Sequence, residues 1–292
     1  QLWLLLLVIY NVLAVDWAGS TRMLQILQAG AIGAGLIALP SWEPGSGRLG
    51  GTLINPNDFG ITMLLGLAVT LLLPIGHRFV HKALTASIIS AFVLGVALSG
   101  SRKAILGVAG LLIAHGMVLL MRSAGRPTKF LGVTVVVVLS SVAVFYWFQT
   151  TPYWSRVENL FFFLQGEDVR EGSLNERAAL MAAGVELWKE NPIIGLGTDQ
   201  FRFHASKFGI RETYSHSNPV EVLANFGLIG ALLYYATYVA LGWRLATCLR
   251  RCWLWKELRY RLLFLTALWM VWLALEAAWV TYYSKTHWIV FA

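Results

Sequence analysis

The sequence predicts an all-α, polytopic integral membrane helix bundle. The chain has 292 residues, of which 57% are hydrophobic and only 13% are charged, and its mean hydropathy is +0.63. Soluble domains carry about 25% charged residues, so a soluble fold is excluded. Apolar stretches of near-spanning length recur along the chain, and a membrane helix needs about 20 such residues. We therefore expect membrane-crossing helices joined by short loops and one long polar connection.

The apolar stretches divide the chain into three parts. We expect N-terminal transmembrane helices in 1–149, a long polar loop in 150–217 and C-terminal transmembrane helices in 218–292. The first stretch begins at Gln1 without a basic leader and is not expected to be a signal peptide. Another apolar stretch begins near the end of the chain, so we expect further spans beyond both ends. The expected spans are 1–15, 23–40, 58–76, 83–98, 104–121, 131–149, 218–243 and 262–280, with a ninth from about 286.

Basic residues predict the orientation of these spans. The stretch 244–261 holds six basic residues and one acid, and the short loops 77–82 and 122–129 hold basic residues and no acid. All three alternate with the spans so that they share one face, which the positive-inside rule makes cytoplasmic. Cys248 and Cys252 lie on this face, where thiols stay reduced, so no disulfide is expected.

The opposite face should then be periplasmic in a bacterial inner membrane. Its long loop is nearly neutral, with seven basic and nine acidic residues, and the net charge of +8 is mostly a topology signal. No nucleic-acid partner is expected, because no basic and aromatic patch accompanies that charge. The segments expected on this face are 41–57, 99–103, 150–217 and 281–287.

The long loop contains the pattern of a helix near 174–190. Ser173-Leu-Asn-Glu176 resembles a capping box at its start, and Asn191-Pro192 should end it. Arg177 would lie in the first turn, where a cation opposes the helix dipole. An anionic ligand would offset that penalty, although Glu176 or Glu171 could do the same. The expected apolar stripe, spaced by three and four residues, is Leu174, Ala178, Met181, Val185 and Trp188.

Polar residues also stand at the expected outer edges of the spans. Arg102, in the tight turn Ser99-Gly-Ser-Arg102-Lys103, is either a headgroup anchor or a ligand-binding residue. Asn57, in Asn55-Pro-Asn-Asp58, is either the cap of the next helix, which the residues favour, or part of a site. Glu221 is costly at a span edge unless it is paired. It either orients His216 or Arg102, or extends its carboxylate to the membrane surface.

These residues favour a particular chemistry. The sequence has no Asp-x-Asp or similar acidic metal motif and no nucleotide-binding fingerprint, so we expect no metal and no cofactor. Two arginines, Arg102 and Arg177, can bind the oxygens of a pyrophosphate and stabilise the charge of a leaving group. A neutral histidine, His216, can accept the proton of an attacking hydroxyl. The combination suits transfer from a lipid-linked pyrophosphate donor at the outer membrane face.

Three segments resemble the O-antigen ligase and O-antigen polymerase superfamily, with the ligases closest. They are Asn55-Pro-Asn-Asp-Phe-Gly60, Ser99-Gly-Ser-Arg102, and the stretch from Arg177 through Asn191-Pro-Ile-Ile-Gly-Leu-Gly197 to His216-Ser217-(nine residues)-Gly227-x-x-Gly230. The last pattern resembles the ligase signature and is the most specific of the three.

The resemblance implies a membrane glycosyltransferase that uses neither metal nor nucleotide. It implies an undecaprenyl-pyrophosphate-linked glycan as donor and lipid A–core as acceptor, or another repeat unit if the chain is a polymerase. Carried over residue by residue, it places Arg102 and Arg177 on the pyrophosphate and makes His216 the general base or an orienter of the acceptor. Asn57, Glu221 and Arg211 are the further candidates for substrate binding.

The sequence argues against two other classes of function. A transporter or flippase for lipid-linked sugars predicts inverted repeats and polar groups near the bilayer midplane. No repeat is found, and the spans 104–121 and 131–149 carry no midplane charge. A scaffold would leave the outer-face arginines and His216 unexplained. An enzyme is therefore the favoured class.

Overall fold

The computed structural model confirms an all-α, multi-pass membrane fold. All the regular secondary structure in the described residues is helical, and four of these helices are long and apolar enough to cross a membrane. The expected spans 1–15 and 131–149 and the stretch from 286 lie outside the described residues, apart from residue 149. The structure describes residues 17–41, 48–50, 55–73, 79–123, 172–210 and 212–282, with single residues 128 and 149. The four candidate spans are Val80–Ser99, Arg102–Ser123, Asn218–Arg251 and Lys256–Ala278.

The chain forms two compact units. The α3 unit comprises Asp16–Val157 and Leu249–Val271. The α10 unit comprises Gln1–Val15, Glu158–Cys248 and Trp272–Ala292.

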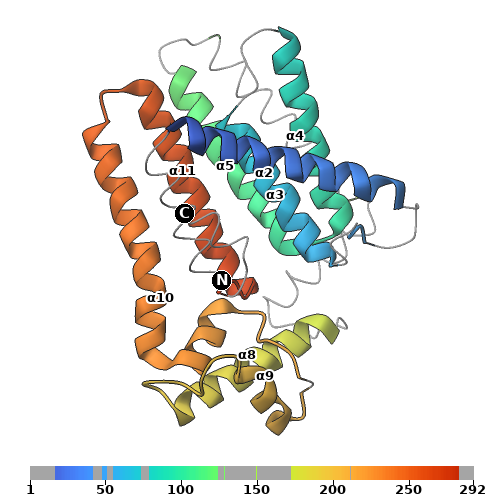
Figure 1. The fold of residues 1–292 in the computed structure, drawn as a ribbon, viewed down its shortest axis with the longest axis vertical. Helices are drawn as coiled ribbons and strands as arrows, with labels where there is room; N and C mark the ends of the chain where they lie inside the picture. Colours follow the sequence, from blue (N-terminus) through green and yellow to red (C-terminus); the bar gives the residue numbers. More distant parts are fainter. Residues whose placement is uncertain are drawn as a thin grey trace. The chain divides into compact units, whose positions relative to one another are not determined.

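Helix α3 (Pro56–Leu72) is the centre of the α3 unit. It packs against α2 (Trp17–Ala38), α4 (Phe79–Ser99) and α5 (Arg102–Ser123), with α2 lying across it (Figure 1). Most of α3 between Phe59 and Leu71 is buried, which explains why its apolar residues do not follow one helical face. A short 3-10 turn, η1 (Leu39–Ser41), extends α2.

Small residues let these helices approach closely. A Cβ atom added at Gly66 would lie 2.4 Å from the Phe92 ring, and one at Gly107 would lie 2.5 Å from the Leu64 side chain. Backbones this close are typical of membrane helix pairs, where small residues allow van der Waals contact in place of a hydrophobic driving force.

The start of α3 corrects one sequence expectation. The N-cap is Asn55 and not Asn57: the Asn55 side chain accepts a 2.9 Å hydrogen bond from the Asn57 amide. Pro56 occupies the first helical position, which its fixed φ and missing amide proton suit. Both asparagines precede the same apolar run, and the proline between them decides the cap, because it must follow the capping residue.

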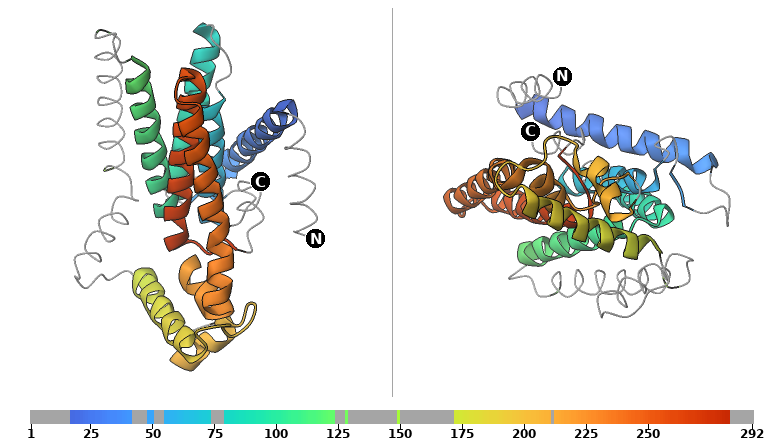
Figure 2. Two further views of the ribbon diagram at one scale, coloured as in Figure 1. Left: turned by 90° about the vertical axis from the view of Figure 1, so that its left-hand side faces the viewer. Right: turned by 90° about the horizontal axis from the view of Figure 1, so that it is seen from below.

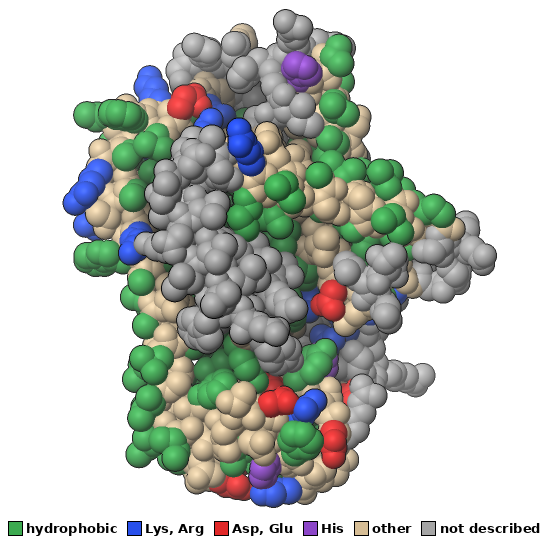
Figure 3. Space-filling model, viewed as in Figure 1, with side chains coloured by type: hydrophobic (Ala, Val, Ile, Leu, Met, Phe, Trp, Pro, Cys, Tyr) green, Lys and Arg blue, Asp and Glu red, His purple; other side chains and the backbone are tan. Residues whose placement is uncertain are grey.

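The end of α5 and the start of α11 (Lys256–Leu275) meet within the α3 unit. Arg122 pairs with Glu257 at 2.9 Å, and its guanidinium lies 4.9 Å from the centre of the Tyr260 ring. Two of the basic stretches in the sequence therefore lie at the same end of this unit. Lys and Arg side chains gather around the connection from α10 to α11 (Figure 3).

The α10 unit is built on one long helix. Helix α10 (Asn218–Arg251) follows α8 (Gly172–Glu190), α9 (Phe201–His204) and η3 (Ala205–Phe208), and η4 (Glu276–Ala278) follows α11. The short elements gather at the start of α10 (Figure 2). Their core, buried away from solvent, consists of Leu180, Leu187, Phe201, Ala205 and Ala224.

The helix expected near 174–190 is present as α8, but the expected apolar stripe is wrong. Met181 and Val185, from that stripe, are exposed, whereas Leu180, Ala183 and Leu187 are buried. Alanines and large apolar residues of α8 itself lie on all sides of the helix, so two different apolar stripes have helical spacing. The buried one includes Gly184, where an added Cβ would lie 2.3 Å from Val220. Close packing against α10 therefore selects the stripe with the smallest residue.

Candidate functional site

His216 has an unusual backbone. Its φ of 60° lies in the left-handed region, which costs a residue with a side chain about 1–2 kcal/mol. The two flanking serines hold this turn. The Ser215 hydroxyl donates to the Ser217 carbonyl at 2.8 Å and accepts from the Ser217 amide at 3.2 Å, and both serines are buried. The His216 ring is only half-buried and contacts Tyr214, with 4.5 Å between ring centres. Strain of this kind is concentrated at functional sites.

Glu221 fastens the same turn to α10. Its carboxylate accepts a 2.6 Å hydrogen bond from the Ser215 amide, and the residue is 1% exposed. It therefore does not extend to the membrane surface. Its contact is with the Ser215 backbone, next to His216, and an orienting role of Glu221 toward His216 stays a prediction.

Glu276 organises a second buried network at the start of α10. It is 1% exposed and accepts hydrogen bonds from Asn218 at 3.0 Å, from Tyr234 at 2.8 Å, and from Tyr238 and Thr281. These donors are neutral side chains. The carboxylate joins η4, the segment that follows it and three turns of α10.

Asn218 extends this network to the His216 turn, two residues away. Its side-chain oxygen accepts from the Thr281 amide at 2.9 Å and from the Tyr282 amide at 3.1 Å, while its nitrogen donates to Glu276. The segment 281–282, which the sequence places on the outer face, is therefore held against the first residue of α10, directly after the long loop 150–217. Burial raises the pKa of the Tyr282 phenol, so this ring stays neutral.

Helix α10 breaks at Gly227, where φ is 63° and ψ is −165°. The segment Pro192–Gly197 fills the break. Amides of Leu228 and Ile229 donate to the carbonyls of Pro192 and Ile193 at 2.9 and 3.1 Å. In return, amides of 196 and 197 donate to carbonyls of 224 and 225 at 2.9 and 2.8 Å. The segment Pro192–Gly197 and the residues around Gly227 therefore contact each other, and each provides hydrogen-bond partners for backbone groups of the other.

Two further candidate residues are Arg177 and Arg211. Arg177 is half-buried in α8 and lies in the second turn, because the helix begins at Gly172. The expected capping residue Ser173 is thus inside the helix, and the dipole penalty on Arg177 is smaller than a first-turn position would give. Arg211 lies outside the described residues.

The α3 unit holds a polar turn of its own. Arg48 donates from Nε to the Ser99 carbonyl and from a terminal nitrogen to the Asn57 side-chain oxygen, each at 2.7 Å. Two segments expected on the outer face, 41–57 and 99–103, are thereby joined. Asn57 therefore binds an arginine that sequence reasoning missed. The only sequence signal for Arg48 is a cation among the polar residues before Asn55.

Arg102 and Lys103 begin α5 beside this turn, and both are half-buried. The residue before them, Ser101, is fully buried, and its hydroxyl has no hydrogen-bond partner among the described residues. The start of a long helix with two cations is suited to an anion. Arg102 and Asn57 thus belong to the α3 unit, and Arg177, His216 and Glu221 belong to the α10 unit.

Comparison with known families decides the assignment. The profile of the O-antigen ligase family matches residues 84–235, just over half of the chain. The chain belongs to the O-antigen ligase family. No curated protein matches it. The family resemblance inferred from the sequence is confirmed, and the chain is a membrane protein of a glycosyltransferase family whose substrates are lipid-linked glycans and glycan acceptors.

The matched residues include some of the polar residues described above and not others. Arg102, Arg177, His216 and the break at Gly227 lie inside the matched residues, whereas Arg48 and Glu276 lie outside them. In this O-antigen ligase family member, the residues that hold the His216 turn, Ser215, Ser217 and Glu221, also lie inside the match, whereas Glu276, which binds Asn218, lies beyond it. No pattern in the sequence connects Glu276 with Asn218, 58 positions away.

Proposed function

We propose that this protein transfers a glycan from undecaprenyl pyrophosphate to a hydroxyl of lipid A–core, on the periplasmic face of the bacterial inner membrane. The observation that best supports this proposal is the strained His216 turn. Buried serines and Glu221 hold this turn where a membrane-spanning helix begins. Because strained backbone is concentrated at functional sites, an unfavourable conformation at a histidine with an accessible ring supports a functional role for that ring.

In the proposed reaction, His216 accepts the proton of the acceptor hydroxyl. The acceptor oxygen then forms a bond to the anomeric carbon, and the bond from that carbon to the pyrophosphate oxygen breaks. Undecaprenyl pyrophosphate leaves with the bonding electrons. Arg102 and Arg177 bind its oxygens and stabilise the developing negative charge. The step needs no metal, because the two guanidinium groups supply the positive charge.

Two alternatives share parts of this proposal. A repeat-unit polymerase would use the same residues and donor but another glycan chain as acceptor. A transporter of lipid-linked sugars would bind the same headgroup without breaking the sugar–phosphate bond. The long polar segment before His216 favours an enzyme with a bulky acceptor, since such loops are commonly functional.

Reconstitution with a donor glycan and lipid A–core tests the proposal. Wild-type protein should move sugar onto the core lipid, and Arg102→Ala, Arg177→Ala and His216→Ala should each abolish transfer. Lys103→Ala should have a smaller effect. His204→Ala is a matched control, because the ring nitrogen of His204 bonds the Gln200 carbonyl within its own short helix.

Each outcome has a distinct meaning. Longer glycans that remain on undecaprenyl pyrophosphate would establish a polymerase. Movement of donor lipid between leaflets without transfer would establish a transporter. Full activity in His216→Ala would remove this residue from the chemistry.

A further inference from the structure

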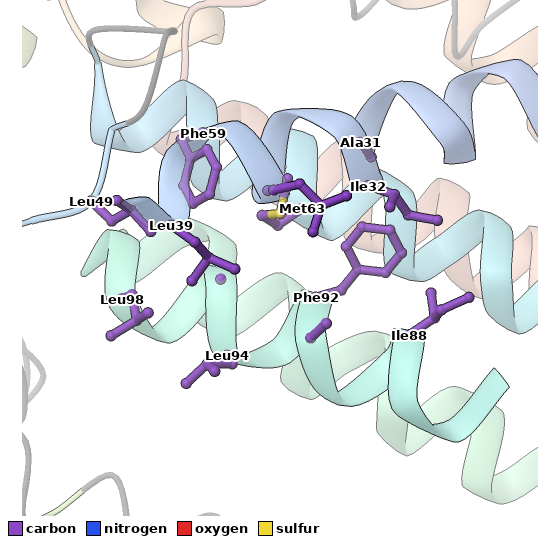
Figure 4. A pocket seen from close by; sticks show the side chains of 14 residues that line it. Ala31, Ile32, Leu39, Leu49, Phe59, Met63, Ile88, Phe92, Leu94 and Leu98 are labelled. Atoms are coloured by element: carbon purple, nitrogen blue, oxygen red, sulfur yellow. The ribbon is translucent and has the colours of Figure 1, made fainter. Parts of the chain in front are cut away.

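The α3 unit contains an apolar pocket beside its polar turn. The pocket has a volume of about 120 Å³ and lies between α2, α3 and α4, with Phe59, Met63 and Phe92 at its centre (Figure 4). Small residues on α2 and α4 create the space. They are Ala31, Gly35, Ala91 and Gly95.

The pocket adjoins the polar turn in three separate chain segments. Leu49 lines it and follows Arg48; Leu98 lines it and precedes Ser99. The Leu49 amide donates to the Leu98 carbonyl at 2.9 Å, which fixes the two segments together. Phe59, one turn into α3, lines the pocket close behind Asn57. One end of the apolar space therefore lies next to the groups that hold Arg48 and precede Arg102.

This arrangement fits an amphiphile with an anionic head and an apolar chain. A dry apolar cavity of about 150 Å³ accepts a benzene molecule of six carbons. A pocket of about 120 Å³ is therefore large enough for one five-carbon isoprene unit.

The rim of the pocket provides a path for the rest of such a chain. Leu36, Leu39 and Leu94 line it and are 64%, 48% and 41% exposed. In a membrane protein, apolar side chains this exposed contact lipid. A long chain whose first unit is held inside can thus continue into the bilayer.

We propose that this pocket binds the isoprene unit next to the pyrophosphate of the donor lipid. The inference rests on the proposed function for the identity of the donor. Lipid tails are as apolar as the pocket, so the unit gains little hydrophobic free energy there. The pocket instead fixes the position of the first unit, and with it the position of the pyrophosphate beside Arg102.

Two substitutions on one helix test the pocket. Gly35→Leu fills it, and the new Cβ would lie 3.6 Å from the Met63 sulfur, an ordinary contact. Gly33→Leu is the matched control, because nothing lies within 4 Å of its Cβ position and it does not line the pocket. Ala91→Phe fills the same pocket from α4 and replaces Gly35→Leu if that variant has a lowered melting temperature.

Farnesyl pyrophosphate binding to purified protein in nanodiscs provides a readout independent of catalysis. We expect Gly35→Leu to raise its Kd about tenfold, with the Kd of Gly33→Leu unchanged. Inorganic pyrophosphate binding should be the same in all variants. Equal weakening in both variants, or no saturable binding to wild type, would overturn the proposal.

Phosphatidylglycerol distinguishes the donor chain from a structural phospholipid. Loss of phosphatidylglycerol binding in Gly35→Leu, with farnesyl pyrophosphate binding retained, would assign the pocket to membrane lipid and overturn the proposal. If wild type transfers no glycan yet binds farnesyl pyrophosphate through this pocket, the proposed function fails while the lipid site stands.

Discussion

Gly227→Ala should separate the Pro192–Gly197 segment from α10. A Cβ at this position would lie 2.3 Å from the Ile193 oxygen and 2.4 Å from its carbonyl carbon, both backbone atoms that no rotamer can move. The four hydrogen bonds across the break are worth about 1 kcal/mol each. The backbone conformation of Gly227 is almost confined to glycine and costs another residue about 1–3 kcal/mol. We expect a loss of roughly 5–7 kcal/mol if the segment detaches.

That loss is large beside a typical net stability of about 5–15 kcal/mol. The melting temperature of the purified protein should fall by roughly 10–30 °C, since 1 kcal/mol shifts it by about 2–4 °C in chains near this size. Gly209→Ala is the control. Gly209 has a φ of 70° but nothing within 4 Å of its Cβ position, so that variant measures backbone strain without the clash. Equal melting temperatures for the two variants would refute the docking of the segment on the break.

Three further substitutions probe the polar networks. Arg48→Ala should lower stability by about 2–3 kcal/mol in thermal melts, because two charge-assisted bonds are lost, and Arg48→Lys should recover only part of it; an unchanged melting temperature would contradict the turn. Glu276→Ala should reduce the yield of folded protein more than any of the others, since it leaves several buried donors without an acceptor; normal yield on size-exclusion chromatography would argue against the network. Glu221→Gln keeps an oxygen for the Ser215 amide and should retain most transfer activity, whereas Glu221→Ala should lose at least tenfold; equal activities would show that the contact does not position His216.

The helical class and the approximate helix positions followed from hydropathy, because a membrane leaves the backbone no other way to satisfy its polar groups over such stretches. Local detail was less predictable. Asn55 and Asn57 both suit a helix start, and only the place of Pro56 separates them. In α8, two stripes have helical spacing, and contacts with a distant part of the chain decide which one is buried.

The candidate site was likewise predictable only in part. His216 and the glycine pattern were visible as residues, but the sequence carries no sign that Gly227 interrupts α10 or that Pro192–Gly197 completes it. Such pairing depends on backbone dihedral angles and on residues about thirty positions apart. Arg48 was missed for a similar reason, since an isolated arginine in a loop has no motif, and its partners Asn57 and Ser99 come from two other segments.

The break at Gly227 also determines how α10 matches the thickness of a membrane. All 34 residues of this helix would extend about 51 Å, well beyond a hydrocarbon core of about 30 Å. From Leu228 to Arg251 the helix extends about 36 Å, which a modest tilt accommodates. The length of the unbroken portion is fixed, so the height of the His216 turn above the lipid chains depends on how far that portion tilts. Bilayers of shorter or longer acyl chains would change this height without altering a single residue.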